Sequence, residues 1–320
     1  MKINSKIKKI TALMLVIALG ISTFVISSVY AADAVDTNRT CTIRFAVPIE
    51  KLNSVDSFSA KLYKVAEIDS SARYKLTENF ASISEIESVD ENTTVEQWQE
   101  YANKAFARIS QNTKADYSLD FVKGKARVQT SVGLYLVVID EIKTPTDIFR
   151  FTPYLISVPG NNYKENGDDT WLYEVDSLIK AEQETRYGKL VIEKKIDTFN
   201  LSMKDATCVF KVEAVKDGEL VYSDVVAIDF KEYGTNSVTI EHIPAGAEVT
   251  VTEVYSSGSY KNTSGVTQTT TIVADDEDGN SVKVSFENTY NDRLITGGTA
   301  VVNRFSKNQD GSWSWEKKSE

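Results

Sequence analysis

Alternation of apolar and polar residues dominates the second half of this 320-residue chain and restricts the folds open to it. Successive side chains of a β-strand point to opposite faces, so alternation is typical of a strand with one buried face. Turn-forming sequences such as Lys216-Asp217-Gly218 separate the alternating segments. The predicted strands are 189–196, 207–215, 219–230, 237–243, 248–255, 267–273 and 281–288. About seven strands in about 105 residues predict a β-sandwich of immunoglobulin-like size over 187–291.

The first half, residues 38–181, is also rich in strand-forming residues, but one helical pattern interrupts it. Strands are predicted at 41–48, 59–68, 125–130, 133–141, 149–159 and 170–180. Thr94 and Gln97 have the spacing of a capping box, which predicts a helix over 94–111. Apolar residues follow at helical spacing and are expected to cover a sheet: Val95, Trp98, Ala102, Ala105, Phe106 and Ile109.

These patterns predict a mainly β protein with two tandem immunoglobulin-like sandwich domains, the first with an inserted helix. The polar segment Glu182–Arg186 lacks periodicity and is interpreted as the linker. Residues 292–320 are interpreted as a tail with a candidate β-hairpin, whose turn is Asn308–Gly311.

The first 31 residues have the pattern of a signal peptide. Four lysines precede an apolar stretch, Ile10–Val29, and small residues follow at Val29-Tyr30-Ala31. Export to the cell surface or the medium is therefore expected, although an uncleaved anchor stays open because the stretch is long enough to span a bilayer. Removing residues 1–31 makes the formal net charge of −10 more negative by four, because the segment has four lysines and no acidic residue.

Composition excludes several kinds of function. A single histidine, His242, argues against Ser-His-Asp catalysis and against zinc clusters, so no metal and no cofactor are expected. The acidic pI of about 4.9 disfavours a nucleic-acid partner. Cys41 and Cys208 each lie in a predicted strand, and two buried free thiols are favoured over a disulfide, which stays open.

Three apolar strand faces in the second domain end in a polar residue. Lys194 follows Leu190 and Ile192, Glu253 follows Val249 and Val251, and Asn288 follows Val284 and Phe286. Burial favours the neutral amine of a lysine and the protonated form of a glutamic acid. A neutral amine is a nucleophile, so Lys194 could join Asn288 as an amide with loss of ammonia, assisted by Glu253. A buried Lys–Glu ion pair with a hydrogen-bonded asparagine is the alternative.

The same residues resemble the Cna B-type domain of Gram-positive surface proteins and pilins. The matching motifs are Gly188–Lys194 at the start, Ile243-Pro244-Ala245-Gly246 leading to Val251-Thr252-Glu253, and Val284–Thr289 at the end. The resemblance implies an intramolecular isopeptide bond between Lys194 and Asn288, with Glu253 as its catalytic acid.

Residues 38–181 resemble, less closely, the N-terminal domain of such pilins, through Lys61–Val65, Gly133–Val137, Pro153–Pro159 and Trp171–Val175. The resemblance places Lys180 where these pilins have the lysine that accepts the next subunit through a sortase. Leu178, Ile179 and Ala181 around it depart from the family's Tyr-Pro-Lys-Asn-type motif. Near the end of the chain, Leu294-Ile295-Thr296-Gly297 resembles a sortase motif that lacks its proline, and no membrane segment follows.

The expected function is that of a structural or adhesive protein of a Gram-positive cell surface. Its expected partners are other pilus or cell-wall subunits, and host proteins or glycans. One alternative is a secreted ligand-binding module that uses the aromatic residues Trp98, Tyr154 and Trp171. A secreted enzyme is a weaker alternative, because no nucleophile–base pair or paired acids occur at a useful spacing.

Overall fold

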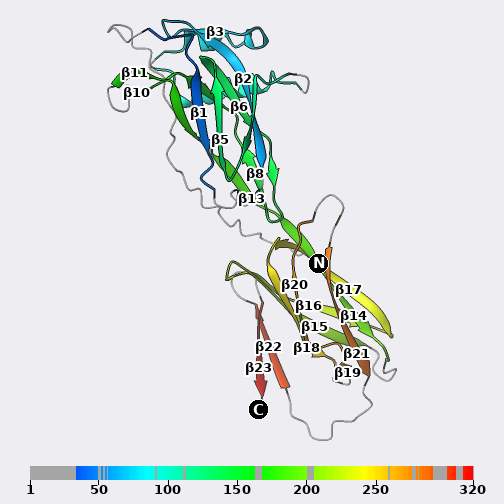
Figure 1. Cartoon of the computed structure of the whole chain (residues 1–320). Helices are drawn as coiled ribbons and strands as arrows, with labels where there is room; N and C mark the ends of the chain where they lie inside the picture. The colour runs from blue at the N-terminus through cyan, green and yellow to red at the C-terminus, as the bar shows by residue number, and fades with distance from the viewer. Residues whose placement is uncertain are drawn as a thin grey trace. The chain divides into compact units, whose positions relative to one another are not determined.

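The computed structural model describes residues 34–49, 52, 55, 57–90, 92–110, 113–162, 168–199, 205–258, 260–275, 279, 281–290, 301–307 and 313–319 (Figure 1). The protein is mainly β with one α-helix in the described ranges, which confirms the predicted fold class. The chain divides into two compact units: one of residues 1–140 and 151–181, the other of residues 141–150 and 182–320. The predicted signal peptide, residues 1–31, lies outside the described residues.

The first unit contains two main sheets and a small hairpin. One sheet has the order β12-β1-β5, with bounds Glu174–Leu178, Cys41–Ala46 and Lys125–Thr130. The other has the order β3-β2-β6-β9, with bounds Tyr74–Leu76, Phe58–Ile68, Gly133–Ile139 and Tyr154–Val158, and β4 (Tyr117–Phe121) pairs with β2. β10 (Gly160–Asn162) pairs with β11 (Asp168–Leu172). Two 3-10 helices, η2 (Glu78–Phe80) and η3 (Ser84–Ser88), follow β3.

Helix α1 spans Val95–Phe106 and begins with the predicted capping box, in which Thr94 and Gln97 bond reciprocally. Tyr101, Ala102 and Ala105 form its buried face, and the helix contacts β6 and β9, so it covers a sheet as predicted. The predicted apolar face is wrong at Val95 and Phe106, which are exposed because they are the first and last residues of the helix. It ends before the predicted residue 111. The N–H groups of Arg108 and Ile109 bond to the carbonyls three residues earlier, those of Ala105 and Phe106. These shorter-range bonds form turns in place of the four-residue spacing of an α-helix.

The second unit contains two four-stranded sheets whose apolar faces form one core. One sheet has the order β17-β14-β21-β19, with bounds Gly234–Pro244, Tyr187–Ile196, Ser281–Tyr290 and Tyr260–Asn262. The other has the order β16-β15-β18-β20, with bounds Glu219–Phe230, Ala206–Lys216, Glu248–Ser256 and Thr267–Thr271. All seven predicted strands are present, and β19 is an addition that the sequence did not predict.

The first and last strands of this sandwich, β14 and β21, are parallel neighbours (Figure 1). β14 also pairs with β17 in antiparallel fashion, so it lies inside the sheet. Gly188 near its start lies against the chain at Val273, where a Cβ atom would approach the Val273 carbonyl oxygen to 1.9 Å. Only glycine fits this close approach.

The segment predicted to be a linker is a strand. β13 (Ala181–Thr185) pairs with β8 (Asp147–Phe151), which pairs with β7 (Ile142–Lys143). Gln183 of β13 donates to the buried carboxylate of Asp147 through its side-chain amide, at 2.8 Å. The interpretation as a linker rested on the polar side chains of this segment. A strand whose side chains are mostly exposed needs no apolar face, because its backbone hydrogen bonds hold it in the sheet. Residues 141–150 accordingly group with the second unit rather than with 38–181.

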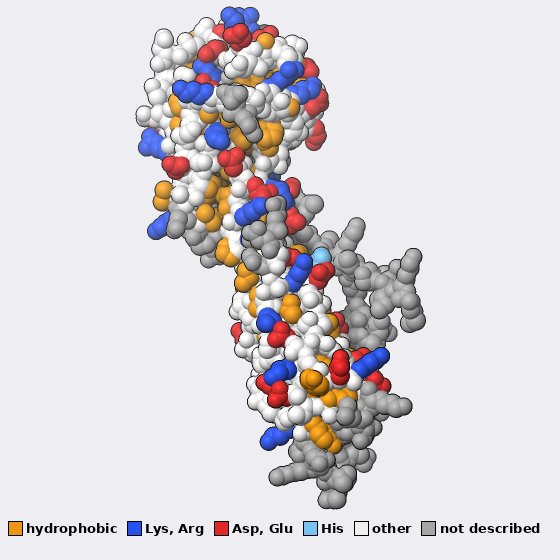
Figure 2. Space-filling view, turned by 90° about the vertical axis from the view of Figure 1, so that its right-hand side faces the viewer, with side chains coloured by type: hydrophobic (Ala, Val, Ile, Leu, Met, Phe, Trp, Pro, Cys, Tyr) orange, Lys and Arg blue, Asp and Glu red, His pale blue; other side chains and the backbone are white. Residues whose placement is uncertain are grey.

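The predicted C-terminal hairpin is present: β22 (Val301–Lys307) pairs in antiparallel register with β23 (Trp313–Ser319). Within the part of the chain that the structure describes, no helix combines the length and apolarity needed to cross a bilayer. Figure 2 shows basic and acidic side chains interspersed on the face in view. Mixed charge of this kind is typical of an ordinary solvated surface.

Candidate cross-linking site

The two sheets of the second sandwich bring the three sequence-predicted polar residues together. Lys194 on β14 and Asn288 on β21 belong to one sheet, and Asn288 pairs in register with Ile196, two residues beyond Lys194 on the same face. Glu253 lies on β18 in the facing sheet. Alternate residues along β14 and along the part of β18 that ends at Glu253 are buried, as the parity of the sequence predicts.

All three side chains are removed from water. The exposed fraction of the Lys194 side chain is 0% and that of Glu253 is 2%, and Asn288 is also fully buried. Phe210 and Phe286 flank the amine, with each ring centroid 6.0 Å from Lys194 Nζ. An ammonium group in such a place loses its hydration, so the surroundings favour the uncharged amine.

One carboxylate oxygen connects the three groups. Lys194 Nζ lies 2.9 Å from Glu253 Oε1, and Asn288 Nδ2 donates to the same oxygen at 2.8 Å. The other amide atom, Asn288 Oδ1, is buried and has no hydrogen-bond partner among the described residues. A buried acceptor without a donor costs about 1–3 kcal/mol, so this amide is poorly satisfied in its present orientation.

Burial dominates the electrostatics of the site. Desolvation lowers the pKa of Lys194 below its usual range, although the Glu253 carboxylate opposes the shift. Burial raises the pKa of the nearby Cys208 thiol to about 12 and that of Cys41, in the first unit, to about 11. Both cysteines are buried and free, as predicted, so they stay protonated at neutral pH and form no disulfide.

Asn262 is a further polar residue of the site that the sequence interpretation missed. Its side-chain Nδ2 donates to Glu253 Oε2, the oxygen that faces away from Lys194. Asn262 lies on β19 and pairs in register with Asn288. The strand β19 has only three residues, so no alternation could be recognised there and Asn262 could not be predicted from the sequence pattern.

Lys195, the neighbouring lysine, points away from the site. Half of its side chain is exposed, and its ammonium pairs with Asp197 and Glu287 at 2.8 and 2.9 Å. These hydrogen bonds raise the pKa of Lys195, so the group stays charged and is not a nucleophile.

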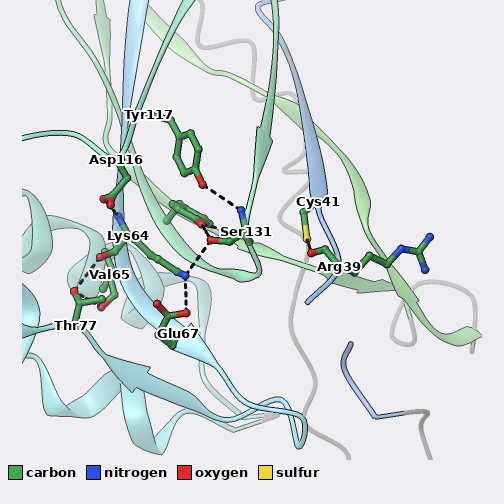
Figure 3. Close-up of polar contacts among 10 residues, drawn as sticks. Arg39, Cys41, Lys64, Val65, Glu67, Thr77, Asp116, Tyr117 and Ser131 are labelled. Atoms are coloured by element: carbon green, nitrogen blue, oxygen red, sulfur yellow. Dashed lines mark hydrogen bonds and ion pairs between the residues drawn. The ribbon is translucent and has the colours of Figure 1, made fainter. Parts of the chain in front are cut away.

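The buried-lysine arrangement has no close counterpart at Lys64 in the first unit (Figure 3). The Lys64 ammonium lies 2.5 Å from Glu67, which is exposed, and 3.1 Å from the Ser131 hydroxyl. Tyr135 bonds to the same serine at 2.9 Å. These contacts form a partly exposed ion pair that anchors neighbouring strands and offers no carboxamide to the amine.

Lys180, the other lysine predicted to react, is exposed and lies between the end of β12 at Leu178 and the start of β13 at Ala181. It belongs to the first unit, whereas Lys194 belongs to the second. The aromatic residues proposed for ligand binding are partly engaged in packing. Trp98 packs edge-on against Tyr74 and Tyr101, and the Tyr154 hydroxyl bonds to Ser177 at 2.7 Å.

Among known protein families, one family model matches the second sandwich. The model is described as a domain of unknown function, DUF5979, and it matches residues 190–291. This range contains Lys194, Glu253 and Asn288. No curated protein matches the chain.

Several of the solved structures similar to the chain are pilins. GBS52, the minor pilin of Streptococcus agalactiae, is 14% identical, with a TM-score of 0.25, and the match covers 81% of this chain and 99% of the pilin. The SpaE basal pilin of Lactobacillus rhamnosus GG is 14% identical, with a TM-score of 0.30 and coverage of 82% and 94%. The shaft pilin SpaA of the same organism is 10% identical, with a TM-score of 0.28 and coverage of 81% and 100%. At these values, function has to be argued from the residues themselves.

Proposed function

We propose that this chain is a structural or adhesive protein of a Gram-positive cell surface, associated with pili. Its second sandwich is braced by an isopeptide bond between Lys194 and Asn288. The observation that carries the proposal is the buried contact of Lys194 and Asn288 with one oxygen of Glu253. The signal-peptide pattern of residues 1–31 and the motifs that resemble Cna B-type domains support the location and the partners, which are other pilus or cell-wall subunits.

The cross-link needs a proton to move before the bond forms. Transfer of a proton from the Lys194 ammonium to Glu253 Oε1 gives a neutral amine and a carboxylic acid, the forms that a dry environment favours. Rotation of the Asn288 amide by half a turn then brings Oδ1 to the protonated oxygen. This hydrogen bond satisfies the buried acceptor and polarises the Asn288 carbonyl.

The bond-forming step exchanges one amide for another. Lys194 Nζ attacks Asn288 Cγ, the bond from Cγ to Nδ2 breaks, and ammonia leaves. Glu253 accepts a proton from Nζ and supplies one to Nδ2, so the carboxyl group ends as it began. No oxidant, metal or external substrate takes part, and the reaction occurs once in each chain. We therefore propose that the protein is not an enzyme toward other molecules.

Formation of the amide removes two unfavourable features of the uncross-linked site: buried charge and an unsatisfied hydrogen-bond acceptor. A buried ion pair costs several kcal/mol of desolvation per ion, and Asn288 Oδ1 adds an unsatisfied acceptor. The amide product has no charge on the lysine nitrogen and keeps one N–H to donate to Glu253. Relief of these costs favours the cross-link over the ion pair.

The position of the bond suits a protein under tension. β14 begins the sandwich and β21 ends it, so force applied at the two ends enters through these neighbouring strands. With Lys194 joined to Asn288, the force passes through covalent bonds, and the residues between them carry no load.

Mass spectrometry of the purified full chain tests the proposal. The intact mass is expected to fall short of the calculated mass by one ammonia, and a tryptic digest is expected to contain the Lys194 peptide joined to the Asn288 peptide. Lys194→Ala and Glu253→Ala are expected to show the calculated mass. The matched control is Lys195→Ala, which removes the exposed neighbour and should still lose ammonia.

Two results would refute the cross-link. One is a wild-type chain that is folded and has its full calculated mass. The other is a joined peptide in which the acceptor is Asn262 instead of Asn288, since Asn262 also contacts Glu253.

A further inference from the structure

The two asparagines that contact Glu253 differ in how their amides are held. Asn262 Oδ1 accepts the backbone N–H of Ser264 at 3.0 Å, so its Nδ2 has to face Glu253 Oε2. Within the described ranges Asn288 Oδ1 has no hydrogen-bond partner, so its amide can rotate without losing a bond to them on that side. One amide is therefore a fixed donor, and the other is a movable reactant.

A fixed N–H donor decides which oxygen of a carboxylic acid carries the proton. The hydroxyl oxygen of a neutral carboxyl is a poor acceptor, whereas the carbonyl oxygen is a good one. Because Asn262 donates to Oε2, the carbonyl character stays on Oε2 and the proton goes to Oε1. Oε1 is the oxygen that lies within hydrogen-bond distance of both Lys194 and Asn288.

We infer that Asn262 is a positioning residue for cross-link formation, because its amide directs the Glu253 proton to the oxygen shared by the two reactants. The inference rests on the function proposed above. Asn262 acts through Glu253 and does not touch the atoms between which the bond forms. Its strand, β19, holds it in register with Asn288, so folding of the last strand completes the donor and the acceptor together.

The rate of ammonia loss during refolding tests this role. Full chains purified in denaturant from inclusion bodies are diluted into native buffer, samples are stopped in acid, and the cross-linked fraction is read from the intact mass. Folding is followed in parallel by near-ultraviolet circular dichroism. In Asn262→Ala, the rate of ammonia loss is expected to fall about 10- to 100-fold while the folding rate is unchanged, since one hydrogen bond to an ionisable group is lost.

Two further variants separate positioning from packing. Asn262→Asp keeps the shape of the side chain but loses the N–H donor when ionised, and it should be as slow as the alanine variant at neutral pH. Asn262→Gln keeps the donor and should return the rate to within about threefold of wild type. The matched control is Asn236→Ala. It removes an exposed amide that bonds to the Asp229 carbonyl on the same sandwich, and it should cross-link at the wild-type rate.

The outcomes are distinct. The inference is overturned if Asn262→Ala and Asn262→Asp cross-link at the wild-type rate, if folding slows by the same factor as ammonia loss, or if Asn262→Gln gives no rescue. A folded wild-type chain that never loses ammonia refutes the proposed function, and with it the role of Asn262. Slow cross-linking in the first two variants with rescue in the third supports the role.

Discussion

Replacing Lys194 by methionine removes the amine of the proposed bond and leaves an unbranched side chain of similar length at a fully buried position. Volume-conserving changes of this kind usually cost less than about 1.5 kcal/mol. Glu253 keeps the amide donors of Asn262 and Asn288, so its carboxyl group stays hydrogen-bonded. The main effect of Lys194→Met is therefore the loss of the cross-link.

The size of that effect follows from the length of chain that the bond closes. Lys194 and Asn288 are separated by about 94 residues. In the chain-entropy model, a covalent link across a loop of this length stabilises the fold by about 4.7 kcal/mol at 25 °C. For a domain of about 100 residues, each kcal/mol shifts the melting temperature by about 4–8 °C, so the second sandwich should melt about 20 °C or more below the wild type.

Differential scanning calorimetry of the full chain measures this shift, because the transition of the second unit should move while that of the first stays in place. The matched control is Lys195→Met. Its half-exposed side chain pairs with the surface carboxylates of Asp197 and Glu287, so the change should alter stability by about 0.5 kcal/mol or less.

A shift of less than about 5 °C in Lys194→Met, in a background where the wild type has lost ammonia, would refute the loop-closure reasoning. An equal shift in Lys195→Met would refute the assignment of the effect to the buried site.

Two other predictions concern charge and attachment. In Asn288→Ala, which cannot cross-link, the free energy of unfolding should rise with pH between the lowered pKa of Lys194 and its ordinary value of 10.5, because the unfolded chain still binds a proton that the folded chain has released. Urea titrations across this pH range should show no such rise in the double variant Asn288→Ala/Lys194→Met. If the free energy of unfolding depends on pH equally in both variants, Lys194 is not the cause of the rise. Lys180 is exposed, and we propose it as the lysine that accepts a neighbouring subunit. Detergent-resistant ladders in cell-wall extracts should disappear in Lys180→Arg but persist in the control Lys125→Arg, and ladders that persist in both would remove Lys180 from consideration.

The sequence was sufficient to predict the second sandwich and its three buried polar groups. Alternation in a strand fixes which residues share a face, and an apolar run before Lys194, Glu253 or Asn288 shows that this face is the buried one. The register that brings the three together depends on pairing between distant strands. From the sequence, the meeting of the three residues was an inference from shared parity, which the resemblance to a family of similar domains supported.

Other features could not be predicted, because they depend on backbone pairing rather than on side-chain pattern. β13 is polar, yet it pairs with β8, and this contact groups residues 141–150 with the second unit. Asn262 lies on a strand of three residues, which is shorter than any recognisable period. Its contact with Glu253 follows from the register of β19 on β21.

The parallel pairing of β14 with β21 also determines when the site can form during synthesis. β14 is made first, but the neighbour that carries Asn288 is made last, after about 90 further residues. Until then, Asn288, the proposed acceptor of the Lys194 amine, is missing, and the side of β14 that pairs with β21 is unpaired. A chain that stops before residue 281 is therefore expected to lose no ammonia and to have its full calculated mass. Loss of ammonia would mark a domain that has been synthesised to its last strand.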